Sequence, residues 1–189
     1  MDPIEGCRRA IDDARALVFS VRADDLTKST PCSEWDVRAL IGHMAAVCQN
    51  FAAVLRGGTM DASMDPGKAS VGGDDPVAAY RAAADDVMQE WEMPDALEKT
   101  LQLPFGPTPA AMGIRIVTAD QLLHAWDLAR ALGRPHQMDE GLAGQSLEMM
   151  QGLLKPEMRG PDSGFGEAQP VLDDASVQDR LLAFSGRRP

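Results

Sequence analysis

The strongest constraint on the fold is a helical spacing of apolar residues that glycine and proline interrupt repeatedly. In residues 4–21, apolar side chains recur every three or four positions, the period of a helix with one buried face. Asp75 followed by Pro76 is a typical helix start, and Gly133 a typical end. Signals of this kind predict helices over residues 4–21, 33–56, 74–93, 108–132, 139–154 and 176–184. We therefore expect an all-α helical bundle.

Short segments depart from this pattern. Ser33 with Asp36 three residues later is a capping-box pattern and is expected to open the second helix. Residues 97–103 alternate apolar and polar side chains, which predicts a short extended segment, and residues 59–73 predict a long loop. We expect one domain over residues 1–189, with the bundle in about 4–154 and a C-terminal extension with a small helix in about 155–189.

Charge and cysteine content exclude several classes of protein. The net charge is −11, so the surface lacks the positive charge that a sequence-independent nucleic-acid binder or a polybasic membrane protein needs. The three cysteines show no disulfide framework or zinc-knuckle spacing. The first residues do not resemble a signal peptide, and we expect no membrane span. These features predict a cytoplasmic protein.

The fourth predicted helix carries the residues most able to do chemistry. Asp120 and His124 are four positions apart and so share one helical face, as two ligands of one metal ion do. Asp127 follows three positions later on that face, where it is expected to accept a hydrogen bond from a ligand or to pair with Arg130 or Arg38. The rest of the face is small or apolar, so these polar side chains are expected to point inward.

The second predicted helix supplies a partner. His43 shares a face with Asp36 and Asn50, and two packed helices would bring it to Asp120 and His124. Two imidazoles and one carboxylate suit Zn²⁺, with Ni²⁺ or Fe²⁺ as alternatives. Other interpretations of the same residues stay open: a buried ion-pair cluster without metal, or a closed shell around a structural metal ion, for example with Asp127 as the fourth ligand.

The remaining reactive or aromatic residues are given structural roles. Cys32 precedes a helix start, but no histidine is near it in sequence, so we expect a structural role rather than a nucleophile. Cys7 and Cys48 are expected to be buried, and His136 to be solvated in a loop. Trp35 and Trp126 lie near the predicted ligands, and we count Trp126 among the pocket residues.

Three segments resemble one protein family. Residues 30–44 read TPCSEWDVRALIGHM and are similar to the T-P-C-x-x-W-x-V-x-x-L-x-x-H segment of mycothiol-dependent maleylpyruvate isomerase-like proteins. Residues 120–133, with the run LHAWDLAR, resemble the second metal-ligand segment of the same group, and residues 179–187 resemble the ending of an actinobacterial-type subgroup. This group belongs to the DinB-like metal-binding helical bundles.

The resemblance implies a DinB-like four-helix bundle with His43, Asp120 and His124 as metal ligands. One position departs from the family, because the isomerase has Glu where this chain has the shorter Asp120. The isomerase also has a separate C-terminal domain that helps to bind its thiol, and this chain is too short for a full copy.

The expected function is that of a metal-dependent, thiol-using transferase or isomerase. In the family the divalent metal ion activates a low-molecular-weight thiol such as mycothiol, which then attacks an electrophilic small molecule. The alternative is a non-catalytic metal- or ligand-binding bundle with a structural metal ion. We expect a monomer or homodimer and no nucleic-acid or membrane partner. The catalytic residues, the substrate and the native metal are not specified by the sequence.

Overall fold

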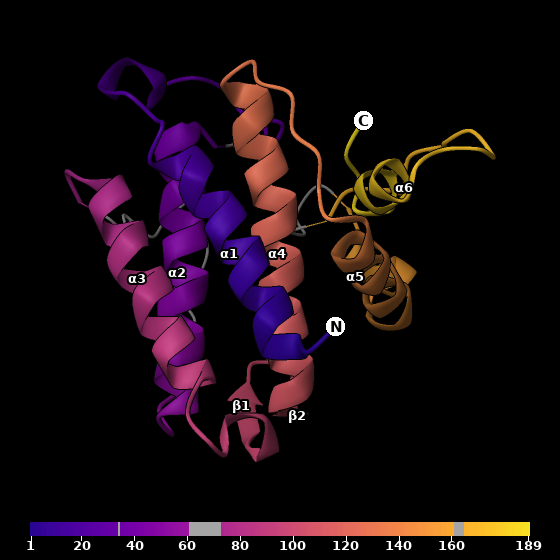
Figure 1. Cartoon of the computed structure of the whole chain (residues 1–189). Coiled ribbons are helices and arrows are strands. Elements are labelled where there is room, and N and C mark those ends of the chain that lie inside the picture. The colour runs from indigo at the N-terminus through magenta and orange to yellow at the C-terminus, as the bar shows by residue number, and fades with distance from the viewer. Residues whose placement is uncertain (34, 61–72, 161–164) are drawn as a thin grey trace. The chain divides into compact units, whose positions relative to one another are not determined.

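Six α-helices and one β-hairpin make up the regular structure in the described part of the chain (Figure 1). The structure is a computed structural model, and it describes residues 1–33, 35–60, 73–160 and 165–189. Most of the predicted loop 59–73 therefore lies outside the described residues. The chain divides into two compact units, Met1–His136 and Gln137–Pro189, which are described separately below. The expectation of a single domain stays a prediction.

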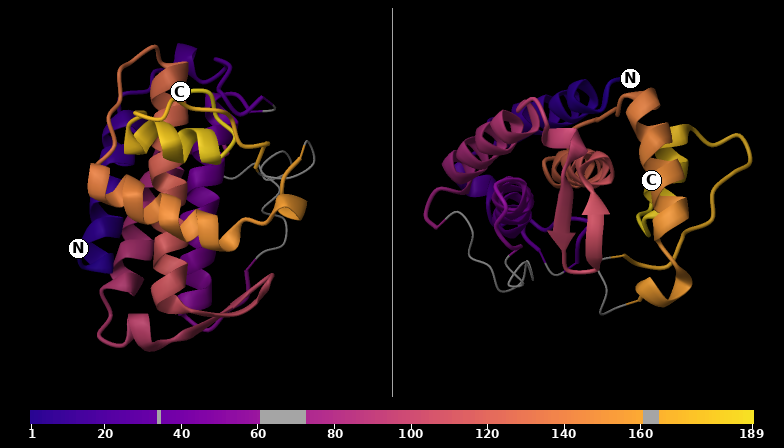
Figure 2. Two further views of the ribbon diagram at one scale, coloured as in Figure 1. Left: turned by 90° about the vertical axis from the view of Figure 1, so that its right-hand side faces the viewer. Right: turned by 90° about the horizontal axis from the view of Figure 1, so that it is seen from below.

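The first unit contains four of the long helices, all near their predicted positions. These are α1 (Pro3–Val18), α2 (Val37–Leu55), α3 (Pro76–Trp91) and α4 (Ala110–Ala131). Helix α1 packs on α3 and α4, and α2 also packs on α3 and α4, so the four run side by side (Figure 2). Two short 3₁₀ turns, Ala23–Asp25 and Ala96–Glu98, lie in the connections.

Helix α2 is the most buried of these helices. By length and composition it could cross a membrane, with a mean hydropathy of 1.2, but 72% of that apolar window is buried inside the protein. Burial of this kind is typical of the core helix of a folded domain. Large side chains from the other helices and the hairpin complete the core around it, namely Ile11, Tyr80, Trp91, Leu101, Ile114, Leu122 and Leu128.

The start of α2 differs from the prediction. Ser33 does not cap this helix. Instead, the carboxylate of Asp36 accepts a hydrogen bond of 2.8 Å from the backbone N–H of Ala39, and the helix begins at Val37. The backbone N–H of Val37 donates to the carbonyl of Lys28, which holds the chain before the helix in an extended conformation and delays the helix start.

The hairpin pairs β1 (Thr100–Leu103) with β2 (Gly106–Pro109) in antiparallel register. The strand predicted at 97–103 is confirmed for its second half, but β2 was not predicted because prolines make up half of it. A two-stranded sheet has only edge strands, where proline is tolerated. Gly113 lets α4 approach the hairpin closely, because a Cβ atom there would lie 2.6 Å from Leu101 Cδ1.

The second unit contains α5 (Glu140–Leu153), a 3₁₀ turn (Pro156–Met158) and α6 (Val177–Phe184). Asp139 and Ser176 cap the two α-helices through their side chains. Leu142, Leu181 and Leu182 of this unit are buried, and α5 packs against α6. These helices occupy nearly the ranges that the sequence predicts.

Candidate metal centre

Helices α2 and α4 bring together the three residues that the sequence singles out as metal ligands. Asp120 Oδ1 lies 3.1 Å from His43 Nε2 and 3.5 Å from His124 Nε2. One nitrogen from each imidazole and one carboxylate oxygen thus lie within 4.8 Å of one another. We call His43, Asp120 and His124 the histidine–aspartate cluster. His43 reaches it across 77 positions of sequence, because α2 packs on α4.

Asp127 orients the ring of His124 from the opposite side. Its Oδ2 atom lies 2.9 Å from His124 Nδ1, and its side chain is fully buried. When Nδ1 carries the proton of the neutral ring, its N–H donates a hydrogen bond to this carboxylate. Nε2 is then unprotonated, and its lone pair faces Asp120 and His43. Helical spacing alone is compatible with a hydrogen bond from a predicted ligand or an ion pair with an arginine, and the structure places Asp127 on His124.

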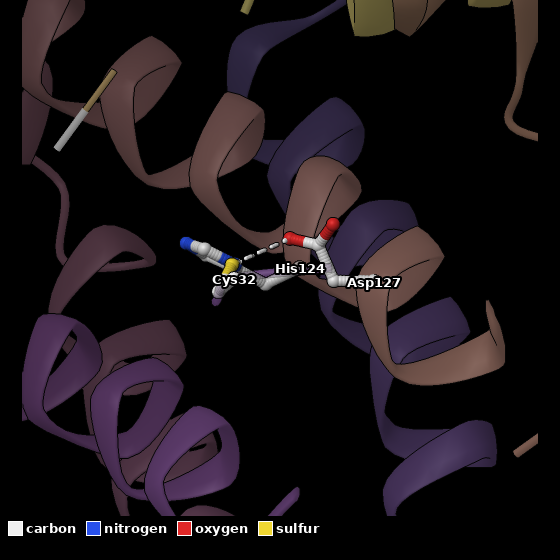
Figure 3. Close-up of side chains that lie close together, drawn as sticks. All are labelled: Cys32, His124 and Asp127. Carbon is white, nitrogen blue, oxygen red and sulfur yellow. Dashed lines mark hydrogen bonds and ion pairs between the residues drawn. The ribbon is translucent and has the colours of Figure 1, made fainter. Parts of the chain in front are cut away.

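Cys32 joins the same hydrogen-bond chain, which sequence reasoning missed. Its Sγ donates to Asp127 Oδ2 at 3.4 Å, and Cys32, His124 and Asp127 form a compact group (Figure 3). No histidine is near Cys32 in sequence, but the fold brings His124 close to it in space. A separation of 95 positions hides this contact from any local sequence rule.

The loop before α2 places Cys32 and Trp35 beside the cluster. The Thr30 hydroxyl accepts a hydrogen bond from the backbone N–H of Cys32 and donates to the Trp35 carbonyl, which fixes the turn between them. The Trp35 ring lies with its centroid 4.8 Å from that of His43 and 5.7 Å from that of His124. Trp35 thus packs against both imidazoles and restricts their rotation.

The second carboxylate oxygen of Asp120 is engaged by α4 itself. Gln121 Nε2 donates to Asp120 Oδ2 at 3.1 Å, and Gln121 Oε1 accepts from the Tyr80 hydroxyl at 2.8 Å. Gln121 and Tyr80 are fully buried. Burial raises the pKa of Tyr80 well above its ordinary value, so this hydroxyl keeps its proton and remains a donor.

Burial also sets the protonation of His124. Loss of solvation lowers its pKa, while the charges of Asp120 and Asp127 oppose this shift only in part. A neutral imidazole is the form that binds a metal ion. Nδ1 of His43 is buried and has no hydrogen-bond partner among the described residues. The rings of Trp35 and His124 lie against this histidine, each with its centroid 4.8 Å from that of His43.

Three other predicted pocket residues have different surroundings. Asp36 caps α2, as described above. Asn50 is buried and donates from Nδ2 to the carbonyl of Ala46 on its own helix. Trp126 is nearly buried and carries the guanidinium of Arg130 over its ring at 5.4 Å. The aromatic ring that packs on the cluster histidines is therefore that of Trp35.

The remaining histidine and cysteines can also be placed. His136 is not solvated as expected, because its Nε2 lies 2.7 Å from Asp13 Oδ2 and its side chain is largely buried. Cys7 and Cys48 are buried, as predicted. Burial raises the pKa of Cys7 to about 12 and raises that of Cys48 well above its ordinary value, so neither thiol ionises readily.

The donor set of the cluster fits a divalent metal ion such as zinc. Its two imidazole nitrogens and one carboxylate oxygen are typical of catalytic zinc sites, which keep a further position for water or substrate. Metal–ligand distances of about 2.0–2.2 Å place neighbouring ligand atoms roughly 3–3.5 Å apart around a tetrahedral ion. The Asp120 distances of 3.1 and 3.5 Å lie in this range.

Comparisons with known proteins give a consistent result. Two curated proteins of Mycobacterium tuberculosis, from strains CDC 1551 / Oshkosh and ATCC 25618 / H37Rv and both named only as uncharacterised, are 36% identical over 187 residues. These matches cover 99% of this chain and 98% of each relative.

Two crystal structures share the fold at low sequence identity. A histidine-to-alanine variant of mycothiol-dependent maleylpyruvate isomerase has a TM-score of 0.69 at 13% identity, covering 87% of this chain and 73% of that one. Another structure of mycothiol-dependent maleylpyruvate isomerase has a TM-score of 0.62 at 15% identity, covering 79% and 66%. The family model described as mycothiol maleylpyruvate isomerase N-terminal domain matches residues 7–129. That range holds the whole histidine–aspartate cluster, and the chain belongs to this family.

Proposed function

We propose that this protein is a metal-dependent, thiol-using transferase or isomerase. In this proposal His43, Asp120 and His124 hold one divalent metal ion, with Zn²⁺ as the first choice and Ni²⁺ or Fe²⁺ as alternatives. The observation that carries the proposal is the convergence of three ligand atoms from two helices within 4.8 Å. The fold in this proposal is a DinB-like four-helix bundle formed by α1–α4, in a cytoplasmic protein that is a monomer or homodimer.

The position of Asp127 favours a catalytic over a structural metal ion. A structural site is expected to close its shell with a fourth protein ligand, and Asp127 was the candidate for it. In the structure Asp127 lies behind His124, on the Nδ1 side of the ring, while the cluster forms on the Nε2 side. Among the described residues the cluster therefore offers three ligand atoms, which supports an open position.

Family membership supports a thiol as the molecule at that position. The family model is described as the N-terminal domain of mycothiol maleylpyruvate isomerase, and both structural neighbours are mycothiol-dependent maleylpyruvate isomerases. When bound, the metal ion would lower the pKa of a coordinated low-molecular-weight thiol and so supply a thiolate nucleophile for an electrophilic substrate. Mycothiol is the first candidate for this thiol.

The side chains of the protein have separate tasks in this proposal. His43, Asp120 and His124 fix the position of the ion, and Asp127 holds His124 in the tautomer that presents Nε2. The Trp35 ring covers one side of both imidazoles and limits the access of water there. Exclusion of water lowers the local dielectric constant and so strengthens the electrostatic effect of the ion on a bound thiol.

Metal content tests the site directly. Protein prepared without added metal and without a histidine tag is compared with His43→Ala and His124→Ala by elemental analysis. We expect about one equivalent of metal in the wild type and a large loss in both variants, with circular dichroism to verify folding. His136→Ala is the matched control, because this third histidine pairs with Asp13 away from the cluster. Wild-type protein without stoichiometric metal would refute the metal site.

Activity is then tested with the zinc-loaded protein. Mycothiol and maleylpyruvate form the first pair, followed by a panel of electrophiles with the same thiol. We expect thiol-dependent turnover that His43→Ala abolishes and His136→Ala retains. Full metal loading without turnover of any pair would support the alternative of a non-catalytic metal-binding bundle.

A further inference from the structure

A buried hydrogen-bond chain connects α3 to the carboxylate of the cluster. The Tyr80 hydroxyl on α3 donates to Gln121 Oε1 at 2.8 Å, and Gln121 Nε2 donates to Asp120 Oδ2 at 3.1 Å. Gln121 Nε2 also donates to the carbonyl of Met44 on α2 at 3.4 Å. The side chain of Gln121 thus contacts α2 and α3 and one oxygen of Asp120.

The neighbours of Gln121 determine which way its amide points. Nε2 faces two acceptors, Asp120 Oδ2 and the Met44 carbonyl, whereas Oε1 faces a phenol that keeps its proton. A flipped amide would place an oxygen against two acceptors and an NH₂ group against a donor, so only one orientation satisfies all partners. Gln121 is 0% exposed, and an unsatisfied orientation there would be costly.

This arrangement divides the two oxygens of the Asp120 carboxylate. Oδ2 faces Gln121, while Oδ1 is the atom that lies 3.1 Å from His43 Nε2 and 3.5 Å from His124 Nε2. Rotation of the carboxylate about its last torsion would otherwise exchange the two oxygens or swing both away from the histidines. A short Asp side chain has fewer torsions than Glu with which to correct such a displacement.

We propose that Gln121, anchored by Tyr80, is a positioning residue that holds Oδ2 of Asp120 and so presents Oδ1 to the metal position as a single-oxygen ligand. The inference rests on the proposed metal site and deepens it. Neither Gln121 nor Tyr80 contacts the metal position, and both act through Asp120. Substitution of a residue that holds a metal ligand in place typically weakens metal binding by 10- to 100-fold.

Zinc affinity of the full chain tests this role. Gln121→Met keeps the length of the side chain and removes the amide, and Tyr80→Phe removes only the hydroxyl that anchors it. We expect Zn²⁺ binding, measured by competition with a chelator, to weaken about 10- to 100-fold in Gln121→Met and by a smaller factor, about 3- to 10-fold, in Tyr80→Phe. The Co²⁺ absorption spectrum of both variants should change, because the carboxylate coordination changes.

Thr118→Val is the matched control. It removes another buried side-chain hydrogen bond on α4, from Thr118 Oγ1 to the Ile114 carbonyl, and leaves Asp120 untouched. We expect its Zn²⁺ affinity and Co²⁺ spectrum to match the wild type, so that a general loss of stability is distinguished from lost positioning. If Gln121→Met fails to fold, Tyr80→Phe decides the question.

The outcomes separate this inference from the proposed function. A wild type that binds Zn²⁺, with variants of the same affinity and the same Co²⁺ spectrum, would overturn the positioning role alone. A wild type that binds no Zn²⁺ would overturn both. Equal weakening in Thr118→Val would also overturn the positioning role, because the effect would then not depend on the contact with Asp120.

Discussion

Replacing Asp127 is the sharpest test of how the cluster is held together. Its Oδ2 atom accepts from His124 Nδ1 at 2.9 Å and from Cys32 Sγ at 3.4 Å, in a fully buried position. Asp127→Asn keeps the shape and one acceptor oxygen but removes the charge. Asp127→Ala removes both. The two variants should therefore weaken the cluster by different amounts.

The size of each effect follows from the hydrogen bonds that are lost. A hydrogen bond to a charged group contributes about 1.5–3 kcal/mol, and a charged partner makes it roughly twice as strong as a neutral one. Asp127→Asn should then lose about 1 kcal/mol of ligand positioning, which is about 5-fold in Zn²⁺ affinity. Asp127→Ala should lose the whole contribution, about 10- to 100-fold.

Competition titrations with a zinc chelator measure both affinities on folded protein, and urea denaturation of the metal-free forms reports stability separately. Asp13→Asn is the matched control, because Asp13 forms a histidine–aspartate pair outside the cluster, in which its partly exposed carboxylate lies 2.7 Å from the largely buried His136. It should leave Zn²⁺ affinity unchanged. Equal affinities for wild type, Asp127→Asn and Asp127→Ala would refute the orienting role of Asp127, as would a larger loss in the Asn variant than in the Ala variant.

Three further predictions test other parts of the structure. Burial lowers the pKa of His124 below 6.5, so between that pH and the folded-state pKa the unfolded chain binds more protons than the folded one. The metal-free protein should therefore lose stability as the pH falls through this range. In urea denaturation, the free energy of unfolding of His124→Gln should depend less steeply on pH there, and an unchanged dependence would contradict the prediction. Asp36→Ala removes the cap of α2 and should lower the free energy of unfolding by about 0.5–2 kcal/mol while leaving Zn²⁺ affinity unchanged. A loss of Zn²⁺ affinity would instead indicate that Asp36 takes part in the metal site. A thiol reagent should label Cys32 in the native protein well before the fully buried Cys7 and Cys48, with mass spectrometry identifying the site, and faster labelling of either buried thiol would contradict the packing.

Local signals in the sequence predicted the elements that bear the site. The Asp75–Pro76 start of α3 and the Gly133 end of α4 are confirmed because capping depends on one or two residues and their immediate neighbours. The four-residue spacing of Asp120 and His124 is equally local. The approach of His43 could be expected because both predicted helices had a polar group on a mostly apolar face, and such faces pack together.

Contacts between distant segments escaped the same reasoning. Cys32 lies in a loop 95 positions from Asp127, and no periodicity relates a loop residue to a helix face. Gln121 was overlooked for a different reason. It follows Asp120 directly and so projects about 100° away on the helix, off the face that carries Asp120 and His124. Its partner Tyr80 belongs to α3, a helix that carries none of the predicted ligands.

The three proposed ligand residues are held to unequal degrees, and this affects how the cluster would respond to substitution. His124 is held by Asp127, and Asp120 by Gln121, so both α4 ligands have a hydrogen bond behind them. His43 has the ring of Trp35 beside it, and its buried Nδ1 has no hydrogen-bond partner among the described residues. Helix α4 therefore carries a preorganised pair of proposed ligands, and α2 carries the third, whose orientation depends on helix packing and on Trp35. Substitutions in the α2–α4 contact should act on the cluster mainly through His43, whereas those at Asp127 and Gln121 act through α4 alone.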